Sequence, residues 1–466
     1  MKRLSIACMA LLVAGCASFT PKPLDPGAQS AAFESRSLAS PAVREFLERS
    51  LGHALTPWPP KSWDLATLTL AACYFQPDLD VAQARSLLAQ AGVISAGARP
   101  NPTASTSFRH KQDAPAGASP WRYSPGISVP IETAGKRDYR IERARHLAQA
   151  ARLREADAVW QVRSRVRASL LAAYPTEALV RRQRDLQAQV VSILERRLAA
   201  GDASQPDVTQ TRLALNRITL ALRENQKQRA VNLTRLASAV GVPVQAMEGA
   251  KVSFAAFERL VAIPDLPPEE ARRKALLSRP DVLAALAGYE ASQSALQLEV
   301  AKQYPDLSLG PGYIWNAGAV SWSLGLSAVL PLLNRNEGPI AEAEARRKEA
   351  AATFLSVQSK AIAQVEESLA GYRYAVRMFE TADALVRDQK RKENAAAAAF
   401  KAGEVDRLTW LSAQSETATA ELARVNASLQ VQRTLGRLED ALRAPLGADA
   451  PALVAQPALS FRPHLK

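Results

Sequence analysis

The feature that most constrains this chain of 466 residues is an internal duplication. Four short stretches recur at spacings of 201 to 203 residues: Gln76–Leu79 with Arg279–Val282, Pro102 with Pro305, Val129–Ile131 with Leu330–Leu332, and Leu198–Asp202 with Phe400–Glu404. Each stretch lies at a boundary between predicted elements. We therefore expect two halves with one order of elements: helix, strand, turn, strand, very long helix, tight turn and returning helix.

Each half contains two segments in which apolar residues alternate with small or polar ones, the period-two pattern of a strand. The predicted strands are residues 103–110, 121–131, 305–315 and 321–331. In the clearest of them, one face holds Trp322, Leu324, Leu326 and Leu330, and the other holds Ser323, Gly325 and Ser327. A strand of about ten residues is long enough to cross a bilayer when tilted. We expect the apolar face to contact lipid and the small, polar face to line a water-filled lumen.

The segments that follow the strands have the pattern of very long helices, predicted at residues 136–200, 207–240, 337–402 and 405–443. At 1.5 Å per residue, a helix over 136–200 would be about 90–100 Å long. A helix of that length needs partner helices to bury its apolar side chains. Pro175 predicts a kink or a break in it.

The N-terminus has the pattern of an export signal, with Lys2 and Arg3 ahead of a short apolar run. That run ends in Leu12-Val13-Ala14-Gly15-Cys16, which resembles a bacterial lipobox. Residues 1–15 are therefore predicted to be a signal peptide, and Cys16 to carry a covalent lipid at the mature N-terminus. The alternative is an ordinary signal with a chance cysteine. Ala17, next to that cysteine, resembles the outer-membrane sorting pattern of such lipoproteins.

The remaining boundaries follow from Pro-rich and irregular stretches. We expect a lipidated tether at 16–62, a first structural repeat at 63–243, a connecting segment at 244–278, a second repeat at 279–444 and a C-terminal tail at 445–466. Only Cys73 would remain beside Cys16 in the mature chain, so no intrachain disulfide is expected once Cys16 is lipidated.

Catalytic and nucleic-acid-binding functions find no support in the sequence. The four histidines are not at metal-ligand spacing, and neither a Gly-rich phosphate loop nor a nucleophile elbow is present. We therefore predict no enzyme activity, no metal site, and no cofactor apart from the lipid on Cys16. The net charge is +14, but the arginines are scattered among acidic residues in helical segments, which is typical of solvated helix faces.

Four strands cannot close a membrane barrel, since about eight are needed, and open strand edges are prohibitive in lipid. The strands therefore predict an oligomer that pools them. The alternative is a non-channel periplasmic coiled-coil lipoprotein, such as an adaptor or a structural spacer. That alternative explains Cys16 and the long helices, but not four alternating segments at equivalent positions.

Over nearly the whole mature chain, these features resemble the TolC family of outer-membrane efflux proteins. The resemblance rests on the repeated Pro-Asp helix starts, the Pro-bounded strand pairs, the segments Pro130–Arg137 and Pro331–Asn336, and the two glycine turns. The first of these segments, PIETAGKR, is most similar to the heavy-metal efflux branch, as in CzcC.

The resemblance implies a mainly α-helical fold with β-strands. Three chains would pool twelve strands into an outer-membrane barrel that continues into a long α-helical periplasmic barrel. It implies a homotrimeric, passive conduit that exports small molecules or metal ions from the periplasm or from an inner-membrane pump of the RND type. A periplasmic adaptor would join the two.

The resemblance also assigns roles to the two helix reversals, which would contact the adaptor. Glycine suits such turns because it accepts positive φ. The candidate contact residues are Gly201, Asp202, Ser204, Gly403, Glu404 and Asp406, and the candidate gate residues are Asp207, Asp406 and Arg407, with Arg407 paired to Asp207 or Asp406. Thr409 stands where the second half would repeat Asp207, which departs from a symmetric acidic gate. The alternative is that the glycines only make turns.

Overall fold

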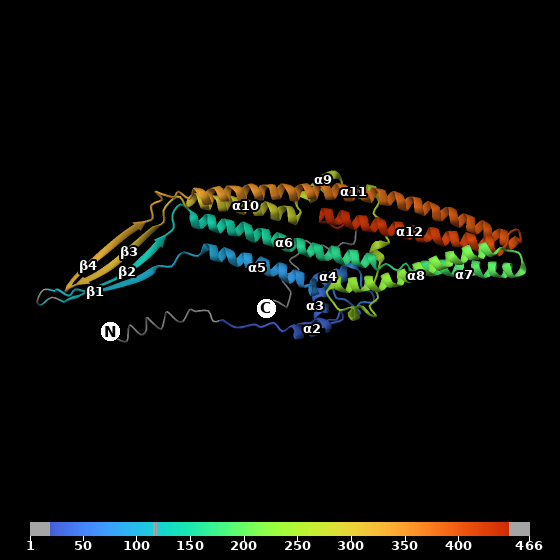
Figure 1. Cartoon of the computed structure of the whole chain (residues 1–466), viewed down its shortest axis with the longest axis horizontal. Helices are drawn as coiled ribbons and strands as arrows, with labels where there is room; N and C mark the ends of the chain where they lie inside the picture. Colours follow the sequence, from blue (N-terminus) through green and yellow to red (C-terminus); the bar gives the residue numbers. More distant parts are fainter. Residues whose placement is uncertain (1–18, 115–116, 118, 447–466) are drawn as a thin grey trace.

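The computed structural model of the protein describes residues 19–114, 117 and 119–446. The molecule is elongated, with its strands at one end and the reversals of its longest helices at the other (Figure 1). The N-terminal helices are α2 (Pro26–Glu34), α3 (Pro41–Leu51), α4 (Leu65–Phe75) and α5 (Pro77–Gly97). The first half continues with β1 (Thr103–His110), β2 (Trp121–Ile131), α6 (Lys136–Ala172), α7 (Glu177–Ala200) and α8 (Gln205–Val240).

Three short 3-10 helices and a nine-residue α-helix connect the halves: η1 (Val244–Met247), η2 (Ala255–Phe257), η3 (Ile263–Asp265) and α9 (Glu269–Leu277). The second half then contains α10 (Pro280–Ala301), β3 (Leu307–Asn316), β4 (Ala319–Ala328), α11 (Glu337–Ala402) and α12 (Arg407–Leu442). The mainly helical fold with four strands agrees with the sequence prediction.

The two halves also share unusual backbone conformations at equivalent positions. Positive φ angles recur 202 residues apart, at Ala134 (56°) and Asn336 (63°), Gly201 (85°) and Gly403 (76°), and Gly241 (88°) and Arg443 (52°). The end of each returning helix is capped from the equivalent residue. Gln76 Nε2 donates to the carbonyl of Ser238 at 2.7 Å, and Arg279 Nη1 donates to the carbonyl of Ala441 at 2.7 Å.

The strands form one antiparallel sheet in the order β1-β2-β3-β4, so the two hairpins join through β2 and β3. Ring contacts place the aromatic residues on one face: Phe108 packs on Tyr123 at 5.5 Å, Tyr123 on Trp315 at 5.4 Å, and Tyr313 on Trp322 at 5.1 Å. The other face carries small polar groups, such as the hydrogen-bonded hydroxyls of Ser128 and Ser308. The sheet is therefore two-sided, as its sequence pattern predicted.

The second hairpin is shifted relative to the sequence prediction. Ala317 and Gly318 both have positive φ, at 50° and 95°, which is the two-residue turn that matches the twist of a hairpin. Because this turn is so short, β4 begins at Ala319 rather than at residue 321, and it ends at Ala328 rather than at 331. Leu330 consequently lies beyond the strand.

The long helix of the first half is interrupted as Pro175 predicts, since α6 ends at Ala172 and α7 begins at Glu177. Its counterpart α11 is continuous over 66 residues. Within the described residues, no helix has the length and hydropathy that crossing a bilayer requires.

The largest hydrophobic core lies midway along the molecule, where α4 packs against α6 and α8. Part of the predicted tether belongs to this core, because Val43, Phe46 and Leu47 of α3 are buried in it. Arg36 fastens the segment between α2 and α3 to the same region. Its Nη1 donates to the carbonyls of Phe75, at 3.1 Å, and Gly241, at 2.7 Å.

A buried cluster of charges joins the two halves. The Glu439 carboxylate of α12 accepts a hydrogen bond from Arg163 Nη1 at 3.2 Å and forms an ion pair with Arg167 Nε at 3.1 Å, both on α6. Gly436 leaves room for Arg167, because a Cβ atom at that position would lie 2.2 Å from Arg167 Nη1. Nearby, Arg443 Nε pairs with Asp157 of α6 at 2.8 Å.

Candidate functional site

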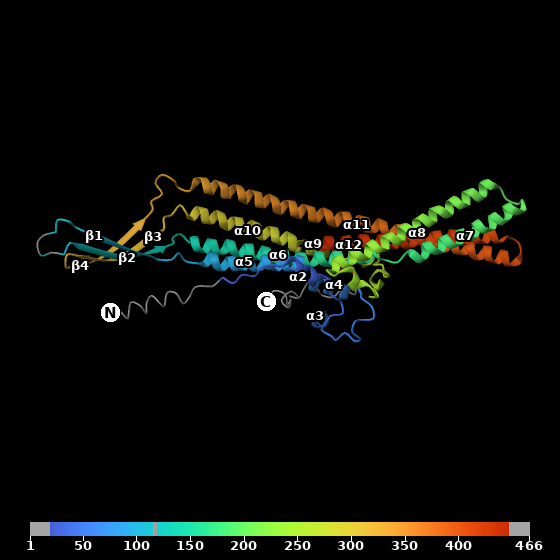
Figure 2. The same ribbon diagram turned by 60° about the horizontal axis from the view of Figure 1, so that its bottom comes forward.

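The two reversals that the sequence singles out lie together at the end of the molecule farthest from the sheet (Figures 1 and 2). We call them the first tip (residues 200–204) and the second tip (402–406). At the first tip, the Gly201 N–H donates to the carbonyl of Leu198 and the Asp202 N–H to that of Arg197. At the second, Gly403 donates to Phe400 and Glu404 to Ala399. Both tips therefore end their helix by the same glycine-centred cap.

The helices that leave the tips begin with capping interactions in which the acidic residue has changed place. Ser204 caps α8 in a capping box. Its hydroxyl accepts from the Asp207 N–H and donates to the Asp207 carboxylate, which also accepts from the Ser204 N–H. In the second tip, Asp406 is the cap, and it accepts from the Thr409 N–H at 2.8 Å and hydroxyl at 2.7 Å. Ser204 and Asp207 are thus replaced by Asp406 and Thr409 at equivalent positions. The departure at Thr409 keeps the cap of the helix and moves the carboxylate by three residues.

An ion pair connects the second tip to the last turn of α7. Arg197 Nη2, at the end of α7, lies 2.5 Å from Asp406 Oδ2 at the start of α12. Hydrogen bonds from Thr409, and then the one from Arg197, lower the pKa of the Asp406 carboxyl to about 2. Within one chain Asp406 therefore pairs with Arg197 and not with Arg407. Arg407 is exposed, and its guanidinium has no ion-pair partner in the part of the chain that the structure describes.

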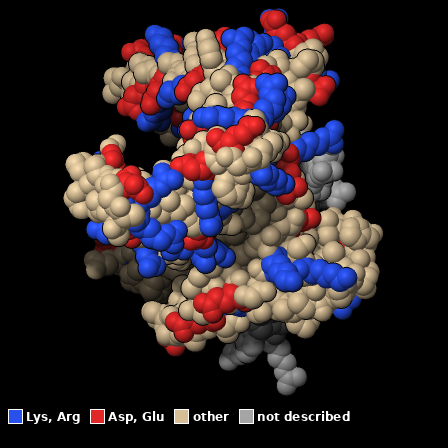
Figure 3. Space-filling model, turned by 90° about the vertical axis from the view of Figure 1, so that its right-hand side faces the viewer, with Lys and Arg blue, Asp and Glu red and all other residues tan. Residues whose placement is uncertain are grey.

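The tip end carries charges of both signs. Viewed end-on, lysine and arginine side chains are interspersed with aspartate and glutamate (Figure 3). Aromatic packing supports the second tip from inside, because the rings of Phe400 and Trp410 stack at 5.2 Å. The surface at this end is thus mixed in charge, and the second tip is supported by stacked aromatic rings.

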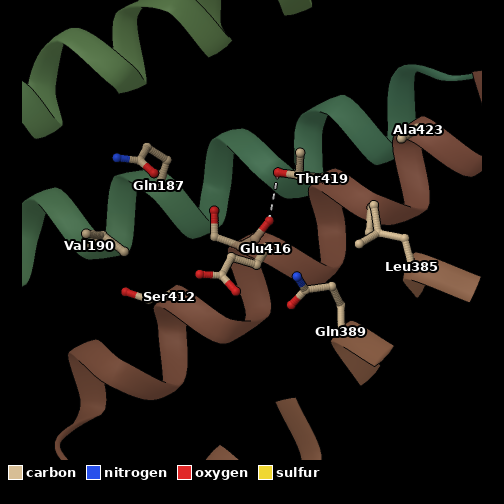
Figure 4. Close-up of a pocket in the computed structure, with 10 residues that line it drawn as sticks. Gln187, Val190, Leu385, Gln389, Ser412, Glu416, Thr419 and Ala423 are labelled. Carbon is tan, nitrogen blue, oxygen red and sulfur yellow. Dashed lines mark hydrogen bonds between the residues drawn. The ribbon is translucent and has the colours of Figure 1, made fainter. Parts of the chain in front are cut away.

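Behind the tips, α7, α11 and α12 form an open groove of about 400 Å³ that sequence reasoning did not find (Figure 4). Six of its ten lining residues are polar: Gln187, Gln389, Ser412, Ser415, Glu416 and Thr419. Lys392 Nζ pairs with Glu416 at 2.5 Å. The groove combines residues more than 200 positions apart, so no local motif signals it.

The residues predicted to face lipid are exposed in the single chain. The exposed fractions are 80% for Trp322, 72% for Leu324, 68% for Leu326 and 65% for Leu330. Such large apolar residues side by side on a surface mark a contact with lipid or another protein. Cys16 lies outside the described residues. Among those described, no group of three or more histidine, cysteine or acidic side chains is arranged to hold a metal ion.

Comparison with known proteins places this architecture. The family model "Outer membrane efflux protein" matches residues 74–242 and 271–443, one segment in each half. The cobalt-zinc-cadmium resistance protein CzcC of Cupriavidus metallidurans is 27% identical, over 75% of this chain and 84% of that protein. The pyoverdine export outer membrane protein OpmQ of Pseudomonas aeruginosa is also 27% identical, over 94% of this chain and 97% of that protein.

A solved structure has the same fold. The outer membrane protein VceC of Vibrio cholerae superposes with a TM-score of 0.66 at 20% identity, over 82% of this chain and 97% of that one. The family and its solved neighbours are channels, in agreement with the expectation that this chain is not an enzyme. The chain belongs to the outer membrane efflux protein family, the TolC-type outer-membrane channels of tripartite efflux systems.

Proposed function

We propose that three copies of this chain assemble into a passive conduit, which crosses the outer membrane through pooled strands and extends into the periplasm through the helices. The observation that carries this proposal is the open four-stranded sheet with one exposed apolar face. Its edge strands, β1 and β4, each have one unpaired side. Unpaired backbone groups cost several kcal/mol each in lipid, so neighbouring copies would have to complete the sheet.

The tips are proposed to dock a periplasmic adaptor that connects the conduit to an inner-membrane pump of the RND type. The contact residues are Gly201, Asp202, Ser204, Gly403, Glu404 and Asp406. Their position at the far end from the sheet supports this role, as does the mixed charge around them. Asp207, Asp406 and Arg407 are proposed to form the gate. Opening would then separate α7 from α12 at the pair Arg197–Asp406.

The exported solutes are proposed to be metal ions or small organic molecules. The relatives are named for resistance to cobalt, zinc and cadmium and for export of pyoverdine, so both classes have support. Cys16 is proposed to carry the lipid that holds the N-terminus at the membrane.

The decisive experiment is purification of the full chain in detergent, followed by mass determination and single-channel recording. A trimer that gives discrete conductance steps is expected. If the Cys16→Ser variant is released from membranes by urea and shows no conductance, the chain is a coiled-coil lipoprotein and not a channel. Deleting the gene and scoring sensitivity to metals and drugs side by side would separate the two solute classes.

A further inference from the structure

The strands carry few charges, and all of them have one sign. Across β1, β2, β3 and β4, the charged residues are Arg109 and Arg122, with no aspartate, glutamate or lysine. The turn between β1 and β2 adds Lys111 and Asp113, which balance each other. A sheet that avoids charge elsewhere therefore retains two arginines.

These two arginines are direct cross-strand partners. Arg109 of β1 is opposite Arg122 of β2 in the antiparallel register. Directly opposite side chains project from the same face, with Cβ atoms about 4.5–5.5 Å apart, and like charges in that arrangement are destabilising. Within the described residues, neither guanidinium forms an ion pair that would offset this repulsion.

The register also fixes which face they occupy. Their neighbours along the strands are aromatic and contact each other on the opposite face, His110 with Trp121 at 4.7 Å and Phe108 with Tyr123 at 5.5 Å. The arginines therefore share the small, polar face with the next pair along, Ser107 and Ser124. Only one pair of opposite residues, His110 and Trp121, separates the arginines from the turn between β1 and β2. This turn is at the end of the sheet farthest from the helices (Figure 1).

We propose that Arg109 and Arg122 form a ring of positive charge inside the outer mouth of the pore, where they bind anions and favour their passage. This inference rests on the proposed trimer, in which each copy supplies two guanidinium groups to one lumen. Guanidinium groups bind carboxylate and phosphate in bidentate fashion. Charges of one sign in a narrow opening also raise the local concentration of counter-ions. An anion between the two arginines offsets the repulsion that the register imposes.

The test uses the full-length channel inserted in planar bilayers with known orientation. The reversal potential in a potassium chloride gradient gives the ratio of chloride to potassium permeability. Inorganic tripolyphosphate, added to one side at a time, probes anion binding. We expect the wild type to favour chloride and to be blocked more strongly from the sheet side than from the tip side.

Substitutions separate charge from size. R109Q/R122Q should lower the permeability ratio several-fold and relieve the block from the sheet side, and R109E/R122E should invert the preference. R109K/R122K should keep the permeability ratio but bind tripolyphosphate more weakly, because lysine cannot bind in bidentate fashion. The matched control is S107Q/S124Q, which adds bulk at the adjacent pair without charge and should leave the permeability ratio unchanged.

Two results would overturn the inference. One is an R109Q/R122Q channel that conducts with the wild-type permeability ratio. The other, which needs no variant to fold, is equal block of the wild type from both sides. Failure of the wild type to form any conducting trimer would instead contradict the proposed channel, so the two failures are distinguishable.

Discussion

The two halves of the chain have the same order of elements but treat their longest helix differently. In the second half α11 runs unbroken for 66 residues, whereas the first half divides the same path into α6 with 37 residues and α7 with 24. α8 supports the break. Asn232 Nδ2 donates to the carbonyl of Ala172, and Asn225 Nδ2 donates to the Thr176 hydroxyl at 2.7 Å. The carbonyl and hydroxyl at the break thus have hydrogen-bond partners on a neighbouring helix, and we call this break, residues 173–176, the hinge.

The hinge also carries a network of charged and polar contacts. Glu177, the first residue of α7, accepts from Gln226, Arg181 and Arg229, and these bonds lower the pKa of its carboxyl to about 2. Beyond the hinge, α7 lies against α12 and α8 lies on the other side of α7 (Figure 2). The first half therefore connects α6 to α7 through a break, whereas α11 crosses the equivalent position of the second half without interruption. Movement of the tips should therefore arise in the first half.

The largest expected effect is a loss of stability when the buried ion pairs between α6 of the first half and α12 of the second half are removed. Glu439→Ala leaves Arg163 and Arg167 buried without their carboxylate, and removing one partner of a buried ion pair costs about 3–5 kcal/mol. The free energy of unfolding in urea should fall by that amount. Asp388→Ala is the control, because its pair with Arg391 is on the surface and should contribute less than about 1 kcal/mol. Equal effects of the two substitutions would show that the cluster does not hold the halves together.

The next effect concerns the hinge alone. Asn232→Ala removes the buried donor to the Ala172 carbonyl and should cost about 1–3 kcal/mol, because that carbonyl loses its partner. Amide hydrogen exchange should accelerate in residues 173–180. The equivalent stretch of α11, residues 375–382, should be unchanged. Faster exchange in both stretches would mean that the break is not a local hinge.

The glycine caps should respond alike in the two halves. At both Gly201 and Gly403 an added Cβ would meet no atom within 4 Å, so an alanine costs only the strain of positive φ. That strain is about 1 kcal/mol. Gly201→Ala and Gly403→Ala should therefore lower the free energy of unfolding by similar amounts. A much larger loss for one of them would reveal a partner contact that distinguishes the tips.

The smallest effect is a pH dependence at the second tip. The pKa of Asp406 is about 2 in the folded chain, below the ordinary value of 3.8. Because this pKa is lowered by folding, the ionised carboxylate stabilises the folded tip at any pH above the pKa of the unfolded chain. That stabilisation is lost as the pH falls from about 4 towards 2. Trp410 fluorescence should change over that window, since this ring stacks on Phe400. Asp406→Asn should abolish the acid transition, and Asp207→Asn should leave it in place.

Much of the fold was predictable because its signals are local. Alternation of residues over ten positions reveals a strand, and Pro175 reveals the hinge. The lining of the groove and the pair Arg197–Asp406 were not predictable, because they join residues from different halves whose spacing carries no pattern. The same holds for α3, whose amphipathic sequence is visible although the surface that buries Phe46 exists only after α4 and α8 have met.

The turn at Ala317 shows another limit. Alanine seldom adopts positive φ, so Gly318 alone did not mark Ala317 as a turn residue, and the predicted strand began two residues late. The inverted cap at Asp406 and Thr409 was visible only as a departure from symmetry. Its meaning needed the observed hydrogen bonds.

The left-handed residue at the end of each returning helix has a consequence for how duplicated genes diverge. Where the first half has Gly241, the second half has Arg443. Arg443 keeps the same backbone conformation, and its side chain pairs with Asp157 in the first half of the same chain. Arg279, the counterpart of Gln76, likewise keeps its cap and adds bonds to Asp281 and Gln364. The end of α12 in the second half has thus gained an ion pair to α6 of the first half, which the end of α8 does not have an equivalent residue to form. Two units that began as equals have become mutually dependent, and neither is expected to stand as an independent module.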